Sequence, residues 1–245
     1  MNNILFRASR IGMLMSDPRS KKEIISETAK AYLVEVFVEK KYGREKDLQN
    51  KYLEKGITME GAAVALYNSV NFKELRKNEL RISNEYIIGT PDLFEGNILP
   101  EAKRIIDLKC SFDIFTFFKA KFSPINKMYY WQMQAYMALT GAKTATLAYC
   151  LVNTPDKILL QEIKRQQWEA LSEGELSKEL RDSIIRLSRY DDIPETDRLY
   201  EIDIPRDDAA IEVMYQRVQD ARLWITNNLL KQKKHHELPI NNKMR

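Results

Sequence analysis

Residues 86–109, YIIGTPDLFEGNILPEAKRIIDLK, contain two aspartates, one shortly after a strand-like run and one within the next such run. The first run, residues 86–88, leads into Gly89-Thr90-Pro91-Asp92, and the second, residues 104–109, carries Asp107 and Lys109. Glu95-Gly96-Asn97 lies between them and supplies turn chemistry. Short β-branched and aromatic runs bounded by such residues indicate strands and a hairpin. We therefore expect strands here, with residues 104–109 forming a central one.

Hydrophobic periodicity predicts helices on both sides of this stretch. Residues 21–41 and 58–70 carry apolar residues at helical spacing, so we expect two helices before any strand. Residues 126–140 have the same spacing and end at Gly141, and residues 144–152 form a strong strand candidate. The order strand, helix, strand implies a crossover connection and some parallel pairing.

The C-terminal part is predicted to be mainly helical. After Pro155 the sequence predicts two charged helices, a short strand near residues 199–204 and a terminal helix, with a basic, frayed tail from Lys231. We expect an α/β fold with a small mixed central sheet flanked by helices. The whole chain, residues 1–245, is expected to be one domain, with a core at about 1–155 and a C-terminal helical extension at about 156–235.

Composition excludes several classes of protein. The 245 residues are 44% hydrophobic and 30% charged, which suits one globular domain. No apolar stretch approaches the roughly 18 residues that span a bilayer, and no secretory signal is present, so we expect a cytoplasmic protein without a membrane partner. The two cysteines, Cys110 and Cys150, are too few for an iron-sulfur or zinc cluster. The net charge of +4 favours a polyanionic partner only weakly.

An acidic residue two positions before a lysine occurs several times, and context separates the copies. Only Asp107-Leu108-Lys109 directly follows an apolar strand-like run. The others lie in charged helical or turn-like sequence, at Glu39-Lys41, Glu101-Lys103 and Glu162-Lys164. Because residues two apart in a strand share a face, Asp107 and Lys109 are expected to point into one pocket.

These residues predict the chemistry of phosphodiester hydrolysis. Two carboxylates, Asp92 and Asp107, together with a main-chain carbonyl are the oxygen ligands that Mg²⁺ prefers. A bound cation of this kind activates water, and Lys109 could orient that water, take its proton or stabilise the developing charge. The alternative for Asp107 and Lys109 is an ordinary ion pair at a strand end, and Asp92 could be a turn residue.

Three motifs together resemble the PD-(D/E)xK nuclease superfamily: Gly89-Thr90-Pro91-Asp92, Ile106-Asp107-Leu108-Lys109 and Gln132-x-x-x-Tyr136. Within it, the chain is most similar to phage exonucleases of the lambda exonuclease and YqaJ viral-recombinase kind, and to RecB-like nuclease domains. The resemblance covers Arg7 to about Pro155 and implies a restriction-endonuclease-like core.

The resemblance also implies roles for individual residues. Asp92 and Asp107 become metal ligands together with the Leu108 carbonyl, and Lys109 becomes the catalytic lysine. Glu60 matches the family's upstream helical acid, for which a plain helix N-terminal acid is the alternative. Gln132 and Tyr136 match the QxxxY element that borders such sites. Arg7, Ser9 and Arg10 match a segment that receives a terminal phosphate of DNA, an assignment for which arginine and serine are chemically suited.

The function that the resemblance implies is a Mg²⁺-dependent DNA exonuclease, in which Mn²⁺ would substitute and no iron-sulfur cluster is present. Its substrate would be linear duplex DNA with free ends, resected in phage-type recombination or repair in a bacterial or phage-infected cytoplasm. Similarity to lambda exonuclease further implies a ring-shaped homotrimer and a single-strand annealing protein as partner.

Two other functions stay open at this stage. One is a structure-specific or sequence-specific endonuclease of the same fold. The other is a non-catalytic DNA-binding recombination scaffold, supported by basic residues at Lys119, Lys121, Lys127, Lys231, Lys233 and Lys234. The aromatic residues of 112–131 favour a core or subunit contact over stacking on unpaired bases.

Overall fold

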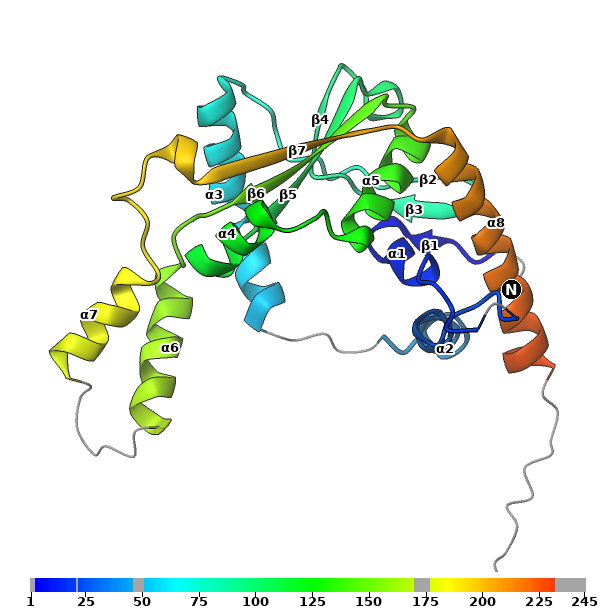
Figure 1. Cartoon of the computed structure of the whole chain (residues 1–245), viewed down its shortest axis with the longest axis horizontal. Coiled ribbons are helices and arrows are strands. Elements are labelled where there is room, and N and C mark those ends of the chain that lie inside the picture. The colour runs from blue at the N-terminus through cyan, green and yellow to red at the C-terminus, as the bar shows by residue number, and fades with distance from the viewer. Residues whose placement is uncertain (1–2, 21, 46–50, 170–176, 232–245) are drawn as a thin grey trace, which may run out of the picture.

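The computed structural model describes residues 3–20, 22–45, 51–169 and 177–231. The predicted basic tail beyond Lys231 lies outside them. Along the chain, the elements are β1 (Phe6–Arg7), η1 (Ala8–Arg10), α1 (Ile11–Leu14), α2 (Glu27–Tyr42), α3 (Lys51–Asn71), β2 (Ile82–Ser83), β3 (Ile87–Gly89), β4 (Leu93–Glu95), η2 (Leu99–Glu101), β5 (Arg104–Cys110), α4 (Ile114–Phe122), α5 (Lys127–Thr140), β6 (Thr144–Cys150), α6 (Asp156–Glu169), α7 (Lys178–Arg186), η3 (Glu195–Asp197), β7 (Leu199–Pro205), α8 (Asp208–Ile225) and η4 (Thr226–Leu230) (Figure 1).

A four-stranded mixed sheet in the order β4-β5-β6-β7 forms the centre of the molecule. β5 pairs antiparallel with β4 and parallel with β6, and β6 pairs antiparallel with β7. The parallel pair is connected through α4 and α5, which provide the crossover that the sequence predicts. The α/β fold with small mixed sheets flanked by helices is therefore confirmed.

A second sheet contains three short strands in the order β1-β3-β2. β1 is parallel to β3, with Phe6 opposite Ile87, and it comes before the first helices. The expectation of two helices before any strand was therefore wrong. A strand of two residues is too short to show an alternating pattern in sequence, and its pairing with residues 81 positions later forms only in the folded chain.

The two faces of the central sheet are covered by different helices. Ile106, Leu108 and Ala148 point toward α3, where they pack in one buried cluster with Met59 and other α3 residues. On the other face, Ile105 and Leu147 pack in a larger core with Met133 of α5. Because residues two apart in a strand share a face, Asp107 and Lys109 lie on the α5 face.

Most predicted elements are present, with shifted boundaries. α2 begins at Glu27 rather than near residue 21, because the side chain of Ser26 caps it by accepting a hydrogen bond from the Ala29 amide at 3.0 Å. The helix predicted at 58–70 extends over Lys51–Asn71. α4 was not predicted, because its nine residues, almost all apolar or basic, do not separate clearly into an apolar and a polar face.

The C-terminal elements extend this core at opposite ends. α6 and α7 pack against each other and project from the lower left of Figure 1, whereas α8 lies along the other end of the molecule. α8 contributes Ile211, Met214 and Val218 to the main core, together with residues of α1 and α2. In the part of the chain described, no helix is both long and apolar enough to cross a membrane.

Candidate active site

The pairing of β4 with β5 brings Asp92 beside Asp107. The last paired residues are Leu93 and Ile106, so Asp92 follows directly opposite Asp107 at the end of the ladder. Residues opposite each other in an antiparallel pair project from the same face with their Cβ atoms about 5 Å apart. Asp92 Oδ2 also accepts a hydrogen bond from the Leu108 amide at 2.8 Å, which fixes the carboxylate against β5.

Lys109 lies on the same face and pairs with Asp107. Its Nζ is 2.6 Å from Asp107 Oδ2, and the side chain of Asp107 is only 2% exposed. Burial acts to lower the pKa of Lys109, but the neighbouring Asp107 carboxylate outweighs this effect and raises the pKa above its ordinary value. Lys109 is therefore a charged amine held at the bottom of the site.

Gln132 of α5 connects these two residues. Its Nε2 donates to Asp107 Oδ1 at 2.9 Å, and its Oε1 accepts from Lys109 Nζ at 3.2 Å. The same Nε2 lies 3.1 Å from the hydroxyl of Tyr136, which donates to the Thr90 carbonyl at 3.3 Å. Four residues separate Gln132 from Tyr136, so one face of α5 supplies both side chains.

Gly89 makes room for this network. A Cβ atom at position 89 would lie 2.7 Å from Tyr136 Cε1 and 2.9 Å from Ala8 Cβ, closer than real Cβ contacts. Glycine therefore lets β3 pass directly under the Tyr136 ring before the chain turns at Pro91 into Asp92. Four of the predicted site residues, Asp92, Asp107, Lys109 and Gln132, consequently converge at one point, with Tyr136 behind them.

The donor set fits a divalent cation. Burial, followed by the charge of Asp107, raises the pKa of Asp92 to about 7. Asp107 Oδ2 is buried and accepts no hydrogen bond of regular geometry, although Lys109 Nζ is near. A hard cation that prefers oxygen ligands would stabilise the charge of Asp92 and would accept the free lone pair of Asp107 Oδ2. Leu108 directly follows Asp107, and its amide donates to Asp92, so its main-chain carbonyl is a third oxygen of the same chemistry beside the two acids.

Glu60 is not gathered with the other acids. It is half-buried near the middle of α3 and forms an ion pair with Lys77, although its charge still contributes to the raised pKa of Asp92. Among the described residues, no three histidine, cysteine, aspartate or glutamate side chains come together as a metal cluster. The described site thus contains two close carboxylates, with the third nearby and paired elsewhere.

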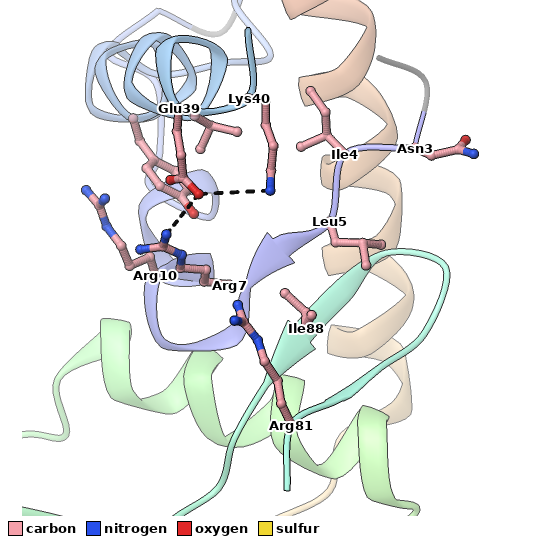
Figure 2. Close-up of a pocket in the computed structure, with 11 residues that line it drawn as sticks. Asn3, Ile4, Leu5, Arg7, Arg10, Glu39, Lys40, Arg81 and Ile88 are labelled. Carbon is pink, nitrogen blue, oxygen red and sulfur yellow. Dashed lines mark hydrogen bonds and ion pairs between the residues drawn. The ribbon is translucent and has the colours of Figure 1, made fainter. Parts of the chain in front are cut away.

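Arg7 and Arg10 line a pocket of about 770 Å³ between β1, α2 and β3. Figure 2 shows Arg7 directed at Glu39 beside Lys40, with Arg81 reaching into the pocket from the opposite wall. Arg7 pairs with Glu39 at 2.9 Å and Arg10 with Glu35 at 2.7 Å.

Ser9, the third residue of the predicted phosphate segment, is exposed on η1 and does not line this pocket. The pocket adjoins the candidate active site through β3, since Arg7 is the register partner of Ile88, four residues before Asp92.

Sequence reasoning missed two contributors to these sites. Arg81 lines the pocket that contains Arg7 and Arg10. The ring centroid of Tyr129 lies 4.7 Å from Lys109 Nζ. Tyr129 lies three positions before Gln132, so helical spacing from the QxxxY element is a signal that could have found it. Arg81 has no comparable signal, because only the β2-β3 pairing brings it to β1.

A family model for the YqaJ-like viral recombinase domain matches residues 7–143, which contain every residue of the site described above. The chain belongs to this family. The match confirms the resemblance inferred from the three sequence motifs.

Solved structures of exonucleases have the same fold as this YqaJ-like chain. A phage-related exonuclease from Haemophilus somnus 129PT is 26% identical with a TM-score of 0.73, over 94% of this chain and 97% of that one. An alkaline exonuclease, LHK-Exo from Laribacter hongkongensis, has the same fold at 16% identity and a TM-score of 0.61, over 95% and 96% of the two chains. LHK-Exo in complex with dAMP matches at 17% identity and a TM-score of 0.61, over 94% and 95% of the chains. No curated protein sequence matches this YqaJ-like chain.

Proposed function

We propose that this protein is a Mg²⁺-dependent DNA exonuclease that hydrolyses phosphodiester bonds at the ends of linear duplex DNA. The observation that carries the proposal is that Asp92, Asp107 and Lys109 converge on one face of the central sheet, at the end of the β4-β5 ladder. Membership in the YqaJ-like family and the fold shared with a phage-related exonuclease support the same reaction. The biological setting would be phage-type recombination or repair in a cytoplasm.

In this proposal, the acids hold the cation and the amine acts on the substrate. Asp92, Asp107 and the Leu108 carbonyl would be the ligands, with Glu60 joining directly or through water once it leaves Lys77. When bound, Mg²⁺ or Mn²⁺ supplies Lewis-acid polarisation of the phosphate and lowers the pKa of water. Lys109 Nζ, kept charged by Asp107, would donate to a phosphate oxygen on which negative charge develops or orient the attacking water.

Gln132 and Tyr136 would position these groups rather than react. Gln132 binds both Asp107 and Lys109, so it sets the distance between the metal-binding carboxylate and the amine. Such supporting hydrogen bonds to metal ligands are typically worth 10- to 100-fold in activity or affinity.

The terminal phosphate of the DNA would bind at the segment that contains Arg7, Ser9 and Arg10. Two of these residues line the pocket beside β3, where Arg81 adds a third guanidinium group. Arg7 forms an ion pair with Glu39, and Arg10 forms one with Glu35. A phosphate would therefore have to replace these carboxylates as the partner of each arginine. Comparison of cleavage rates on phosphorylated and dephosphorylated DNA ends, in wild type and Arg7→Ala, measures this contribution.

Substitution at Lys109 tests the active-site assignment. We expect Lys109→Ala and Asp107→Ala to abolish digestion of linear duplex while leaving folding and DNA retention largely intact. Lys103→Ala is the matched control, because Lys103 is the lysine of the neighbouring acid-x-lysine copy and is exposed. A folded Lys109→Ala protein that digests linear DNA at the wild-type rate would remove the assignment.

The substrate form and the metal separate this proposal from its alternatives. An exonuclease digests end-labelled linear duplex and spares covalently closed circles, whereas an endonuclease also cuts the circles. A non-catalytic scaffold binds DNA in chelator and never cuts, whereas the proposed enzyme regains cleavage when Mg²⁺ or Mn²⁺ is added.

The assembly is also part of the proposal. The chain, residues 1–245, would form one nuclease unit, three copies would form a ring around the duplex, and a single-strand annealing protein would receive the product strand. Sedimentation velocity on the purified protein measures the number of copies in the assembly, and we expect a trimer. Co-sedimentation with the annealing protein measures whether the two proteins bind each other.

A further inference from the structure

We propose that a row of aromatic and basic side chains leading away from Lys109 binds a single strand of DNA by stacking on its bases. This inference rests on the proposed function. It assigns one DNA strand, of the substrate or of the product, to a surface beside the candidate active site. We call the surface the aromatic row. It consists of Tyr129, Tyr149, Tyr200, Lys121, Phe118 and Phe122.

The register of the central sheet creates the first part of the row. Lys109 of β5 is the partner of Tyr149 of β6, and Tyr149 is the partner of Tyr200 of β7. Side chains at the same level of adjacent strands share a face, so these three residues form a line across the sheet. The rings of Tyr149 and Tyr200 are stacked, with centroids 6.2 Å apart.

Helices α5 and α4 complete the row. Tyr129 of α5 contacts Lys109 Nζ at 4.7 Å and the Tyr149 ring at 6.3 Å. Beyond Tyr200, Lys121 Nζ lies 6.0 Å from the Tyr200 ring and 5.9 Å from the Phe118 ring. Phe118 then stacks with Phe122 at 6.2 Å. Each ring or amine therefore contacts the next, from the candidate active site to the surface.

The outer end of the row is solvent-exposed in a way that core packing does not explain. Phe115, Phe118 and Phe122 follow helical spacing along α4, yet they are 69%, 41% and 79% exposed, whereas Phe117 alone is buried. An apolar stripe at this spacing normally faces a core. Here it faces solvent, so it is available to a partner.

The charges of α4 favour nucleic acid as that partner. Lys119 and Lys121 lie between the exposed rings, and within the described residues neither pairs with a carboxylate. The one acid at this helix, Asp113, is used as the N-terminal cap, where it accepts from the Thr116 amide at 2.7 Å. Aromatic faces interleaved with lysines are the arrangement that binds single strands without sequence preference.

Binding to an oligo-dT 20-mer tests the proposal. Fluorescence anisotropy with a fluorescein-labelled strand is measured in chelator, where no cleavage occurs. We expect Phe118→Ala/Phe122→Ala to weaken binding about 100-fold, since loss of one stacked base costs about tenfold. Phe72→Ala is the matched control, because Phe72 is 96% exposed at the end of α3, which covers the opposite face of the sheet. It should bind as wild type does.

A second variant separates stacking from subunit contact. Phe118→Leu/Phe122→Leu retains apolar surface but removes the rings, so a single-strand site loses affinity while a subunit interface is preserved. If the alanine variant changes the sedimentation coefficient and the leucine variant binds oligo-dT normally, α4 is an interface and the proposal is wrong. Wild-type affinity in the folded alanine variant would also overturn it.

The binding assay and a cleavage assay distinguish failure of this inference from failure of the proposed function. A protein that binds oligo-dT through the aromatic row but cleaves nothing in Mg²⁺ would retain this inference and contradict the proposed function. A protein that digests linear duplex but binds oligo-dT equally well without Phe118 and Phe122 would do the reverse.

Discussion

At the scale of single residues, Gln132 determines how the candidate site is held together. Its amide binds Asp107, Lys109 and Tyr136 from one buried position. Removal of such a group leaves buried charged partners without their hydrogen bonds, which costs more than the loss of an exposed contact. Gln132 is therefore the position where a small change should separate catalysis from substrate binding.

We predict that Gln132→Met lowers kcat by about 10- to 100-fold with little change in KM, because methionine keeps the volume and removes all three hydrogen bonds. Steady-state kinetics on linear duplex measures the two constants. Thermal unfolding of the same variant controls for loss of the fold. An unchanged kcat would show that Lys109 and Asp107 hold their positions without this amide.

Gly89 gives a second residue-scale prediction, on stability. Gly89→Ala should lower the free energy of unfolding by about 1–3 kcal/mol, since the new methyl group overlaps Tyr136 and Ala8. Gly61→Ala should have the opposite sign, with a gain of about 0.5–1 kcal/mol, because Gly61 is exposed within α3 and has open space at its Cβ. Urea denaturation of both variants checks the pair. Equal midpoints for Gly89→Ala and wild type would contradict the close packing at Tyr136.

At the scale of elements, structural context decides which local sequence patterns become part of the candidate site. An acidic residue two positions before a lysine occurs four times in the sequence. Only the pair in β5 lies in a strand, one that is buried at residues 105–108 and more exposed at its last two residues. The last pair of the β4-β5 ladder is Leu93 with Ile106. Asp92, the residue before Leu93, therefore lies beside Asp107, the residue after Ile106. The strands thus create the site, and α5 supplies the side chains that hold it.

The start of α2 gives a prediction at this scale. Ser26→Ala should lower the free energy of unfolding by about 1 kcal/mol, because the Ser26 hydroxyl caps the helix at the Ala29 amide and is buried. For a chain of this size the melting temperature should fall by about 2–4 °C. Ser123→Ala is the control, since Ser123 is exposed and its side chain caps no helix. A melting temperature equal to that of Ser123→Ala would argue against the cap.

At the scale of the whole molecule, the proposed metal site would make the stability of the fold depend on the cation concentration. Asp92 directly precedes β4 and Asp107 lies in β5, so the pair of carboxylates exists only in the folded chain. A ligand that binds the folded state alone stabilises it by about 2.7 kcal/mol at 100 times its Kd. The acid pair should therefore couple Mg²⁺ concentration to global stability.

We predict that saturating Mg²⁺ raises the melting temperature by about 5–10 °C, from the expected 2–4 °C per kcal/mol. The variant Asp92→Asn/Asp107→Asn should lose this shift while it remains folded, because neutral amides are poor ligands for hard cations. Differential scanning calorimetry with and without Mg²⁺ provides the measurement. A shift of equal size in the double variant would place the cation elsewhere.

The sequence by itself indicated the strands and the helix that carry the candidate site. The β-branched run before Asp107, the spacing of Gln132 and Tyr136, and the helix-ending Gly141 are local signals, and each depends only on neighbours within a few residues. They were enough to predict β5, α5, β6 and the mixed α/β fold, and the resemblance to a nuclease family added Gln132 and Tyr136 to the expected site.

Only the tertiary structure decided which distant residues meet. The β4-β5 register puts Asp92 opposite Asp107, packing leaves Glu60 with Lys77, and strand pairing brings Arg81 to the pocket of Arg7. In sequence, the exposed phenylalanines of α4 indicated a core or subunit contact, because hydrophobicity does not specify which way a helix faces. Contacts between residues far apart in the chain depend on how whole elements pack, and no local pattern encodes that packing.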